Sequence, residues 1–154
     1  MTIKVFSFDV FDTCLVRTKA APTDLFYDLA RGLLASRNLD SREALHELAQ
    51  ARVEAERRAR RHADREDITI HAVYAHFHEL KAWGLDPEQA KALELELELA
   101  AVRPILAIRN RIVQARADGG RVIFISDMYL PQETIRAMLE RHDLAQPEDR
   151  LYVS

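Results

Sequence analysis

Residues 5–15 read Val5-Phe6-Ser7-Phe8-Asp9-Val10-Phe11-Asp12-Thr13-Cys14-Leu15, and the rest of the chain is organised around them. The apolar run over residues 3–9 predicts a short buried strand that stops at Asp9. Asp12 and Thr13 favour turns, because their side chains bind nearby backbone. A carboxylate at the carboxyl end of a buried parallel strand lies where open α/β sheets bind ligands. A lone aspartate in that position more often only caps a loop.

A second stretch, Arg121-Val122-Ile123-Phe124-Ile125-Ser126-Asp127, repeats the pattern. It predicts another apolar strand, and this strand ends in a hydroxyl beside a carboxylate. Two buried strands ending in Asp9 and Ser126 can place a nucleophile and a phosphate-binding hydroxyl in one crevice.

At these residues the chain resembles the haloacid dehalogenase superfamily, which consists largely of phosphohydrolases. The family's first motif, DxDx[TV] after an apolar strand, is matched by residues 9–13, and its second motif by Ser126. The longer segments around these motifs, SFDVFDTCLVR and ISDMYLP, resemble a subgroup of predicted hydrolases found beside or fused to glycosyltransferases. The resemblance implies an α/β fold with a Rossmann-like parallel core of about three strands, formed by residues 1–16 and 105–154. It implies an all-helical cap over residues 17–104.

The resemblance also implies a mechanism. Asp9 would attack phosphorus and form an aspartyl-phosphate that water hydrolyses. Mg²⁺ would bind the Asp9 carboxylate and the Phe11 carbonyl. Ser126, the N–H of Asp127 and the loop amides around Phe11 and Thr13 would hold phosphoryl oxygens. Thr13 would also orient the loop, and the substrate would be a small phosphorylated metabolite.

Phe11 departs from the family pattern, because phosphatases of this family usually carry a second aspartate there as general acid/base. Phenylalanine transfers no protons, so the acid/base would come from Asp12, the cap or the substrate. Two alternatives follow: dehalogenase-type chemistry, which needs no metal, and a non-catalytic module associated with a glycosyltransferase. A register with Asp12 as the nucleophile is disfavoured, because Asp9 would then interrupt the strand.

Two further family motifs have no match before Ser154. We therefore expect the chain to be the N-terminal part of a hydrolase, a shortened one, or a natural short relative that has lost catalysis. In the first two cases the 154-residue chain itself would be inactive.

Composition sets outer limits on function. The chain has 154 residues, 48% of them hydrophobic, which suits one domain or a small domain with an insertion. Its net charge of -3 gives no case for nucleic-acid binding. The single cysteine, Cys14, excludes an intrachain disulfide and a cysteine-based zinc site. Neither a signal peptide nor a membrane-spanning run is present, so we expect a cytoplasmic protein.

Periodicity predicts helices through most of the remaining chain. Helices are expected over residues 22–36, 41–64, 69–83, 105–117 and 131–142. A further helix is expected to start at Pro87, to include a Leu/Glu alternation at residues 93–99 and to break at Pro104. A loop is expected over residues 10–20, and a third strand over residues 151–153. Asp40 with Glu43 predicts a capping box for the second helix. The alternation is assigned to helix because its neighbours are strong helix formers, and its leucines would cover two faces.

Two polar groups in the expected cap invite a functional reading. A basic cluster, Arg57, Arg58, Arg60, Arg61 and Arg65, would suit an anion-binding surface, but its interleaved acids favour a solvated helix face. The histidines His71, His76 and His78 are not spaced by four, so metal binding is disfavoured and packing or surface roles are expected.

The last expectation concerns assembly. Without later strands, the edge of residues 3–8 would present unpaired backbone groups flanked by Val5, Phe6 and Phe8. Apolar edges invite pairing with another chain, so we expect self-association through this edge. The alternative is that the cap and loops shield it.

Overall fold

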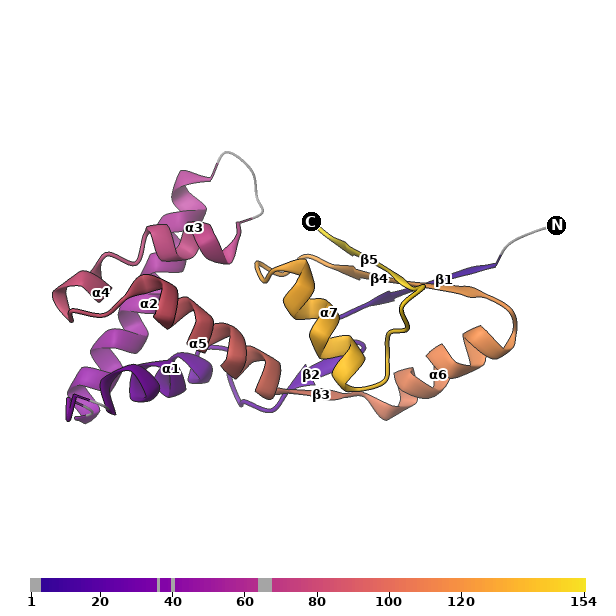
Figure 1. Cartoon of the computed structure of the whole chain (residues 1–154), viewed down its shortest axis with the longest axis horizontal. Coiled ribbons are helices and arrows are strands. Elements are labelled where there is room, and N and C mark those ends of the chain that lie inside the picture. The colour runs from indigo at the N-terminus through magenta and orange to yellow at the C-terminus, as the bar shows by residue number, and fades with distance from the viewer. Residues whose placement is uncertain (1–3, 36, 40, 64–67) are drawn as a thin grey trace. The chain divides into compact units, whose positions relative to one another are not determined.

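The structure is a computed structural model that describes residues 4–35, 37–39, 41–63 and 68–154. The chain forms two compact units (Figure 1). Residues 1–18 and 102–154 form the α/β unit, and residues 19–101 form the helical unit. The α/β unit contains β1 (Val5–Asp9), β2 (Leu15–Arg17), β3 (Val102–Pro104), α6 (Leu106–Ala117), β4 (Arg121–Ser126), α7 (Gln132–Arg141) and β5 (Arg150–Val153). The helical unit contains α1 (Asp24–Ala35), α2 (Arg42–His62), α3 (Ile70–Ala75), α4 (Glu79–Ala82) and α5 (Pro87–Ala100).

The main sheet of the α/β unit is parallel and has the strand order β1-β4-β5. Asp9 of β1 lies opposite Ile125 of β4, so the carboxyl ends of these two strands lie side by side. α6 precedes β4 and α7 connects β4 to β5, as parallel pairing requires helical crossovers. The α/β class with an incomplete Rossmann-like core is therefore confirmed. Ile3, the predicted start of the first strand, lies outside the described residues.

The two faces of this sheet differ. α6 and α7 cover one face (Figure 1), where Phe124 is fully buried and Leu151 is 5% exposed. The opposite face carries Val5, Ile125 and Tyr152, whose exposed fractions are 56%, 46% and 49%. Parallel sheets are usually covered on both faces. Within the α/β unit, one face of this sheet is thus left open.

A short antiparallel ladder joins β2 to β3, with Arg17 opposite Val102 and Leu15 opposite Pro104. The predictions of a loop over residues 10–20 and of a helix reaching Pro104 are wrong at these positions. The ladder is favoured over a loop and a longer helix because Leu15 and Val102 are completely buried in it and the two strands pair through their backbones. It also places Arg17 and β3 in the α/β unit, whereas the sequence assigned residues 17–104 to the cap.

The helical unit packs α1 against α2 and α5, and α3 against the same two helices. Part of its core is a cluster of buried apolar residues, Leu25, Phe26, Ala49 and Ala101. The Ser41 hydroxyl caps α2 by accepting the Ala44 N–H at 3.2 Å. Asp40, predicted to cap this helix, lies outside the described residues.

The single helix predicted over residues 69–83 is divided into α3 and α4. Thr69 caps α3 as expected, through the Ala72 N–H at 3.2 Å. The N–H of His76 then bonds to the Val73 carbonyl at 3.1 Å, and this tight turn ends the helix. The apolar spacing survives the turn, because Phe77 remains 3% exposed. Periodicity alone therefore did not reveal the break.

α5 confirms the helical assignment of the Leu/Glu alternation, but the helix buries glutamates. Glu94 and Glu98 are 0% and 2% exposed, whereas the leucines between them are only half-buried. The helix contacts both α1 and α3, as two-sided packing predicts, and Leu97 packs against the core of the helical unit. Glu94 is accommodated because buried polar partners surround it.

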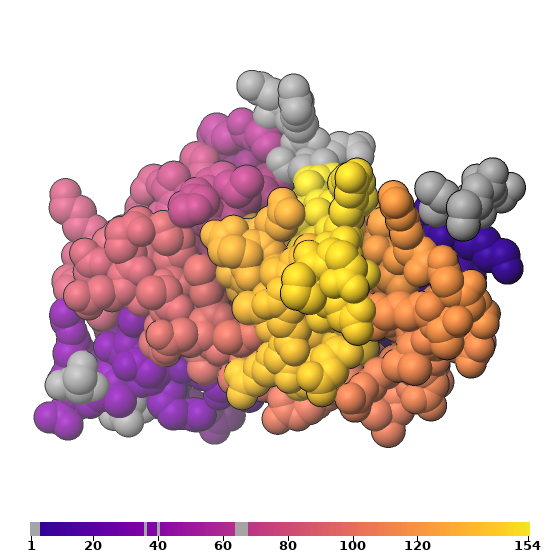
Figure 2. Space-filling view, turned by 45° about the vertical axis from the view of Figure 1, so that its right-hand side comes forward, coloured from indigo at the N-terminus to yellow at the C-terminus, as the bar shows by residue number. Residues whose placement is uncertain are grey.

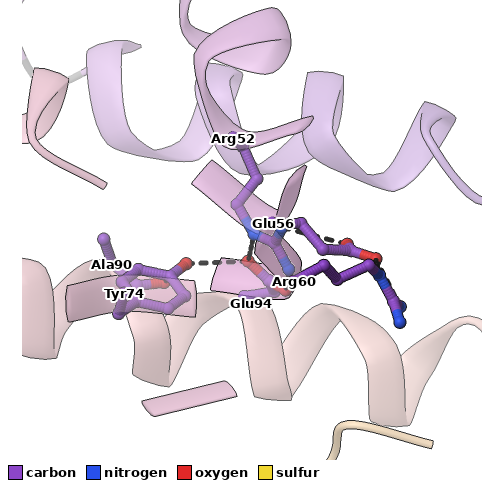
Figure 3. Close-up of polar contacts among 6 residues, drawn as sticks. All are labelled: Arg52, Glu56, Arg60, Tyr74, Ala90 and Glu94. Atoms are coloured by element: carbon purple, nitrogen blue, oxygen red, sulfur yellow. Dashed lines mark hydrogen bonds and ion pairs between the residues drawn. The ribbon is translucent and has the colours of Figure 1, made fainter. Parts of the chain in front are cut away.

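Those partners come from α2 and α3 (Figure 3). The Arg52 guanidinium is fully buried and donates from Nε and Nη2 to the two Glu94 carboxylate oxygens at 2.7 and 2.6 Å. The Tyr74 hydroxyl donates to Glu94 at 2.8 Å, and Arg52 reaches Glu56 at 3.3 Å. The guanidinium also lies 4.4 Å from the centre of the Phe26 ring. An ion pair thus forms part of the interior of the helical unit.

Among the described residues, no helix is long and apolar enough to cross a membrane. The C-terminal segment, drawn in yellow and ending with β5, lies at the surface of the α/β unit (Figure 2).

Candidate functional site

Asp9 is the last residue of β1, and its side chain is exposed at the carboxyl end of the sheet. The Thr13 hydroxyl donates a hydrogen bond to Asp9 Oδ2 at 3.2 Å. This contact holds the side chains of Asp9 and Thr13 together across the loop. A carboxylate that is exposed yet oriented by a hydroxyl has an oxygen left to act as a nucleophile or a ligand.

The loop after Asp9 is held by backbone hydrogen bonds. The N–H groups of Cys14 and Leu15 both donate to the Val10 carbonyl, at 2.9 and 2.8 Å. The Asp12 N–H donates to the Leu15 carbonyl at 2.8 Å, and Asp12 has a left-handed backbone with φ of 56°. Aspartate tolerates this conformation better than most residues. The loop is therefore a defined turn, and it supports Thr13 beside Asp9.

Cys14 lies fully buried beneath this turn. Burial, and then the charge of Asp9, raises the pKa of its thiol to about 12. Cys14 is therefore a packing residue, as expected from the sequence, and its thiol stays protonated.

Ser126 ends β4, one residue beyond the position opposite Asp9. Its side chain is only 2% exposed, and its hydroxyl oxygen accepts the Met128 N–H at 3.2 Å. The strand register brings Ser126 to the same end of the sheet as Asp9, but its hydroxyl is engaged by its own turn. Asp127 follows it and is exposed.

Among the described residues, some backbone amides in the turns after β1 and β4 have no acceptor. Within the described part of the chain, the N–H groups of Phe11, Thr13 and Asp127 donate no hydrogen bond. They belong to the turns that follow β1 and β4. Unpaired amides beside an exposed carboxylate are suited to binding anionic oxygens.

The donor set for a metal is small. In the segments that the structure describes, no group of three or more His, Cys, Asp or Glu residues could hold an ion. The Asp9 carboxylate and the Phe11 carbonyl supply only oxygen donors, which Mg²⁺ prefers. Mg²⁺ commonly takes one or two carboxylates and completes its shell with water and substrate phosphate. The chemistry of these donors fits that limited role.

The side chain of Phe11 is half-buried. The Arg17 guanidinium lies 5.2 Å from the centre of its ring. Asp12 is exposed, and the hydrogen bond to the Asp9 carboxylate comes from Thr13.

The basic cluster of the helical unit is engaged in ion pairs. Arg57 and Arg61 pair with Glu54 at 2.6 and 2.9 Å, and Arg60 pairs with Glu56 at 2.8 Å. These contacts support a solvated helix face. Arg58 pairs with Glu79, and Arg65 lies outside the described residues.

The histidines gather more closely than their spacing indicated. The rings of His62 and His76 stack with centres 4.9 Å apart, and the His78 ring lies 6.0 Å from that of His76. Burial, followed by the neighbouring positive charges, lowers the pKa of His76. His62 was not among the residues that the sequence singled out, because it comes from the end of α2.

The buried Arg52–Glu94 pair was also missed by the sequence reasoning. Its only signal was a Leu/Glu alternation inside a helix, which places glutamates on the same side as core positions.

Comparison with known proteins adds no identification: no protein-family model matches the chain, and no curated protein matches it significantly.

Proposed function

We propose that the chain carries the nucleophile of a Mg²⁺-dependent phosphohydrolase that acts on a small phosphorylated metabolite. The observation that carries this proposal is the exposed Asp9 carboxylate, oriented by Thr13 at 3.2 Å and adjoined by unused amides. The resemblance of residues 9–13 and Ser126 to haloacid dehalogenase motifs supports the same chemistry.

In this proposal a carboxylate oxygen of Asp9 attacks phosphorus while the bond to the leaving oxygen breaks. The Thr13 hydroxyl holds the other carboxylate oxygen, so the attacking oxygen keeps one orientation. The N–H groups of Phe11, Thr13 and Asp127 stabilise charge on the phosphoryl oxygens. Water then attacks phosphorus, which releases phosphate and restores Asp9. Mg²⁺, bound through the Asp9 carboxylate and the Phe11 carbonyl, would offset the repulsion between carboxylate and phosphate.

Phe11 has a consequence for substrate choice. Because it cannot protonate the leaving oxygen, the reaction should favour leaving groups that depart as stable anions. Acyl and aryl phosphates should therefore phosphorylate Asp9 faster than alkyl phosphates.

The test is phosphorylation of the protein itself. The chain is incubated with acetyl phosphate and Mg²⁺, quenched in acid and weighed by mass spectrometry. We expect one phosphoryl adduct, mapped to Asp9, that is absent from Asp9→Asn and retained in Asp12→Asn, the matched control. An adduct that survives Asp9→Asn would contradict the proposal. So would the absence of an adduct from both the wild-type chain and a chain extended beyond Ser154.

Dehalogenase-type chemistry is the second candidate, and Phe11 in place of an acid favours it. Asp9 would attack carbon, halide would leave with the bonding electrons, and water would hydrolyse the resulting ester. Halide release from a short 2-haloacid in the presence of a chelator would support this reaction over phosphoryl transfer. If no extended or native chain turns over either substrate, a non-catalytic module associated with a glycosyltransferase becomes the better proposal.

A further inference from the structure

Arg17, the last residue of β2, has no role in the reaction proposed above. In the β2–β3 ladder it lies opposite Val102, so these two side chains share one side of the ladder with Leu15. Leu15 and Val102 are completely buried, whereas Val16, on the other side, is exposed. Arg17 therefore lies on the buried side of the ladder, and its own side chain is half-buried.

The Arg17 guanidinium lies over the ring of Phe11, 5.2 Å from the ring centre. A cation over the face of an aromatic ring is attracted to it, so this contact restricts where the guanidinium can go. The Phe11 backbone forms a bridge with Leu15, in the strand that carries Arg17. The ring and the guanidinium therefore link the ladder to the turn after β1.

Phe11 also lies on the same side of the chain as the nucleophile. The Val10 N–H donates to the Ile125 carbonyl at 3.0 Å, so pairing with β4 continues one residue beyond β1. Side chains alternate along a chain paired in this way. Val10 is completely buried, whereas Asp9 is exposed and Phe11 half-buried. This alternation indicates that Phe11, and the Arg17 guanidinium over it, project from the side that carries the Asp9 carboxylate.

We propose that Arg17 stabilises the negative charge that develops on the leaving oxygen when Asp9 attacks phosphorus. This inference rests on the proposed function and extends it. As an oxygen of Asp9 bonds to phosphorus, the bond from phosphorus to the leaving oxygen breaks, and the electron pair stays on that oxygen. The attacking and leaving oxygens lie roughly in line, so the developing charge is a phosphoryl group away from Asp9 and out of reach of Thr13.

Arg17 would act by charge and hydrogen bonding, without proton transfer. Phe11 supplies no proton, and an arginine keeps its own protons in proteins, so the leaving group departs as an anion beside the guanidinium. A fixed donor aimed at a developing oxyanion lowers the barrier most where the most charge develops. More basic leaving groups should therefore depend more strongly on Arg17 than acidic ones do.

The dependence of rate on the leaving group tests this role. Substituted phenyl phosphates of rising phenol basicity are mixed with excess protein and Mg²⁺, and release of each phenol is followed by absorbance. Arg17→Gln should slow release of the most basic phenol about 100-fold and hardly slow the most acidic one. Arg17→Lys keeps the charge and should retain most of the wild-type dependence. Arg103→Gln is the matched control, because Arg103 lies on the opposite side of the same ladder.

Arg17→Gln that slows every phenol by the same factor would overturn the inference, because a purely structural loss does not distinguish leaving groups. A steeper dependence in Arg103→Gln would overturn it as well. If Arg17→Gln does not fold by circular dichroism, Phe11→Leu decides: it removes the ring that holds the guanidinium and should also steepen the dependence, and an unchanged dependence would refute the role of Arg17.

Failure of the proposed function gives a different result. Phenol release that survives Asp9→Asn, or no release by either the wild-type chain or a chain extended beyond Ser154, would overturn that function and this inference with it. Release that requires Asp9 but has the same dependence in Arg17→Gln as in the wild type would overturn only the role of Arg17.

Discussion

Replacing Glu94 by leucine should destabilise the helical unit far more than any surface substitution in it. Arg52 and Glu94 are both fully buried, and two hydrogen bonds of 2.7 and 2.6 Å join them. Without Glu94, the guanidinium keeps a longer ion pair with Glu56, at 3.3 Å and with the Glu56 side chain 23% exposed. Tyr74 keeps the Ala90 carbonyl at 3.1 Å as an acceptor, so its loss is smaller.

The expected loss of stability is set by the buried Arg52 charge, which Glu94→Leu deprives of its main counter-ion. Removing one partner of a buried pair typically costs about 3–5 kcal/mol, because the other charge remains desolvated. Glu56 offsets part of this, so we expect about 3–4 kcal/mol. Arg52→Met combined with Glu94→Leu removes both charges and fills similar volume. The double variant should lie within about 1–2 kcal/mol of the wild type.

Urea unfolding followed by circular dichroism measures these differences in free energy. Arg57→Met is the control, because its ion pair with Glu54 is largely exposed, at 63% and 36%, and should contribute at most about 1 kcal/mol. A loss below about 1 kcal/mol for Glu94→Leu, or a double variant as unstable as the sum of the single ones, would refute the reasoning.

Three further outcomes are expected. Gly120→Ala should lower the unfolding free energy by about 1–3 kcal/mol, because a Cβ there would lie 2.3 Å from the Phe6 ring. Gly119→Ala has open space and only its positive φ of 73° to resist it, so a larger loss there would contradict this account. The pKa of His76 is lowered by burial and then by neighbouring positive charges. The unfolded chain therefore binds more protons than the folded chain as the pH falls through about 6.5, and the free energy of unfolding should decline there. Urea unfolding at a series of pH values should show a shallower decline for His76→Gln than for the wild type, and an equal decline in the two would count against this explanation. Burial and a nearby carboxylate raise the pKa of Cys14 to about 12, so a thiol reagent near pH 8 should label it only after denaturation, and fast labelling of the native protein would show this wrong.

Local patterns predicted the parts of the fold that local forces determine. The strand over residues 121–126 and the helix expected over 105–117 have nearly the predicted bounds, because apolar runs and flanking glycines mark them directly. The β2–β3 ladder was missed because its three-residue strands lie far apart in sequence and carry no period of their own. Pairing between distant short segments is decided by tertiary burial, which periodicity does not report.

In the candidate site, too, the features that depend on distant parts of the chain could not be predicted from the sequence. The resemblance implied that Thr13 orients the loop after Asp9, but it did not specify the hydrogen bond that the Thr13 hydroxyl donates to the Asp9 carboxylate. The buried state of the Ser126 hydroxyl was not predictable, because it depends on the turn that follows and on the helices over that face. The glutamates inside α5 were unexpected for a related reason: their buried partners lie on other helices.

The β2–β3 ladder has a consequence for how the chain was assembled. Because Arg17 and Val102 are cross-strand neighbours, residues 18–101 form one long loop of the β2–β3 hairpin. Closing a longer loop costs little extra, about 0.6 kcal/mol for each doubling in length. The α/β unit therefore tolerates inserts of very different size at this point. A two-residue turn such as Asn-Gly could replace the whole helical unit without moving either strand. The insertion is modular, and helical units could be exchanged here during evolution while Asp9 and its loop stayed unchanged.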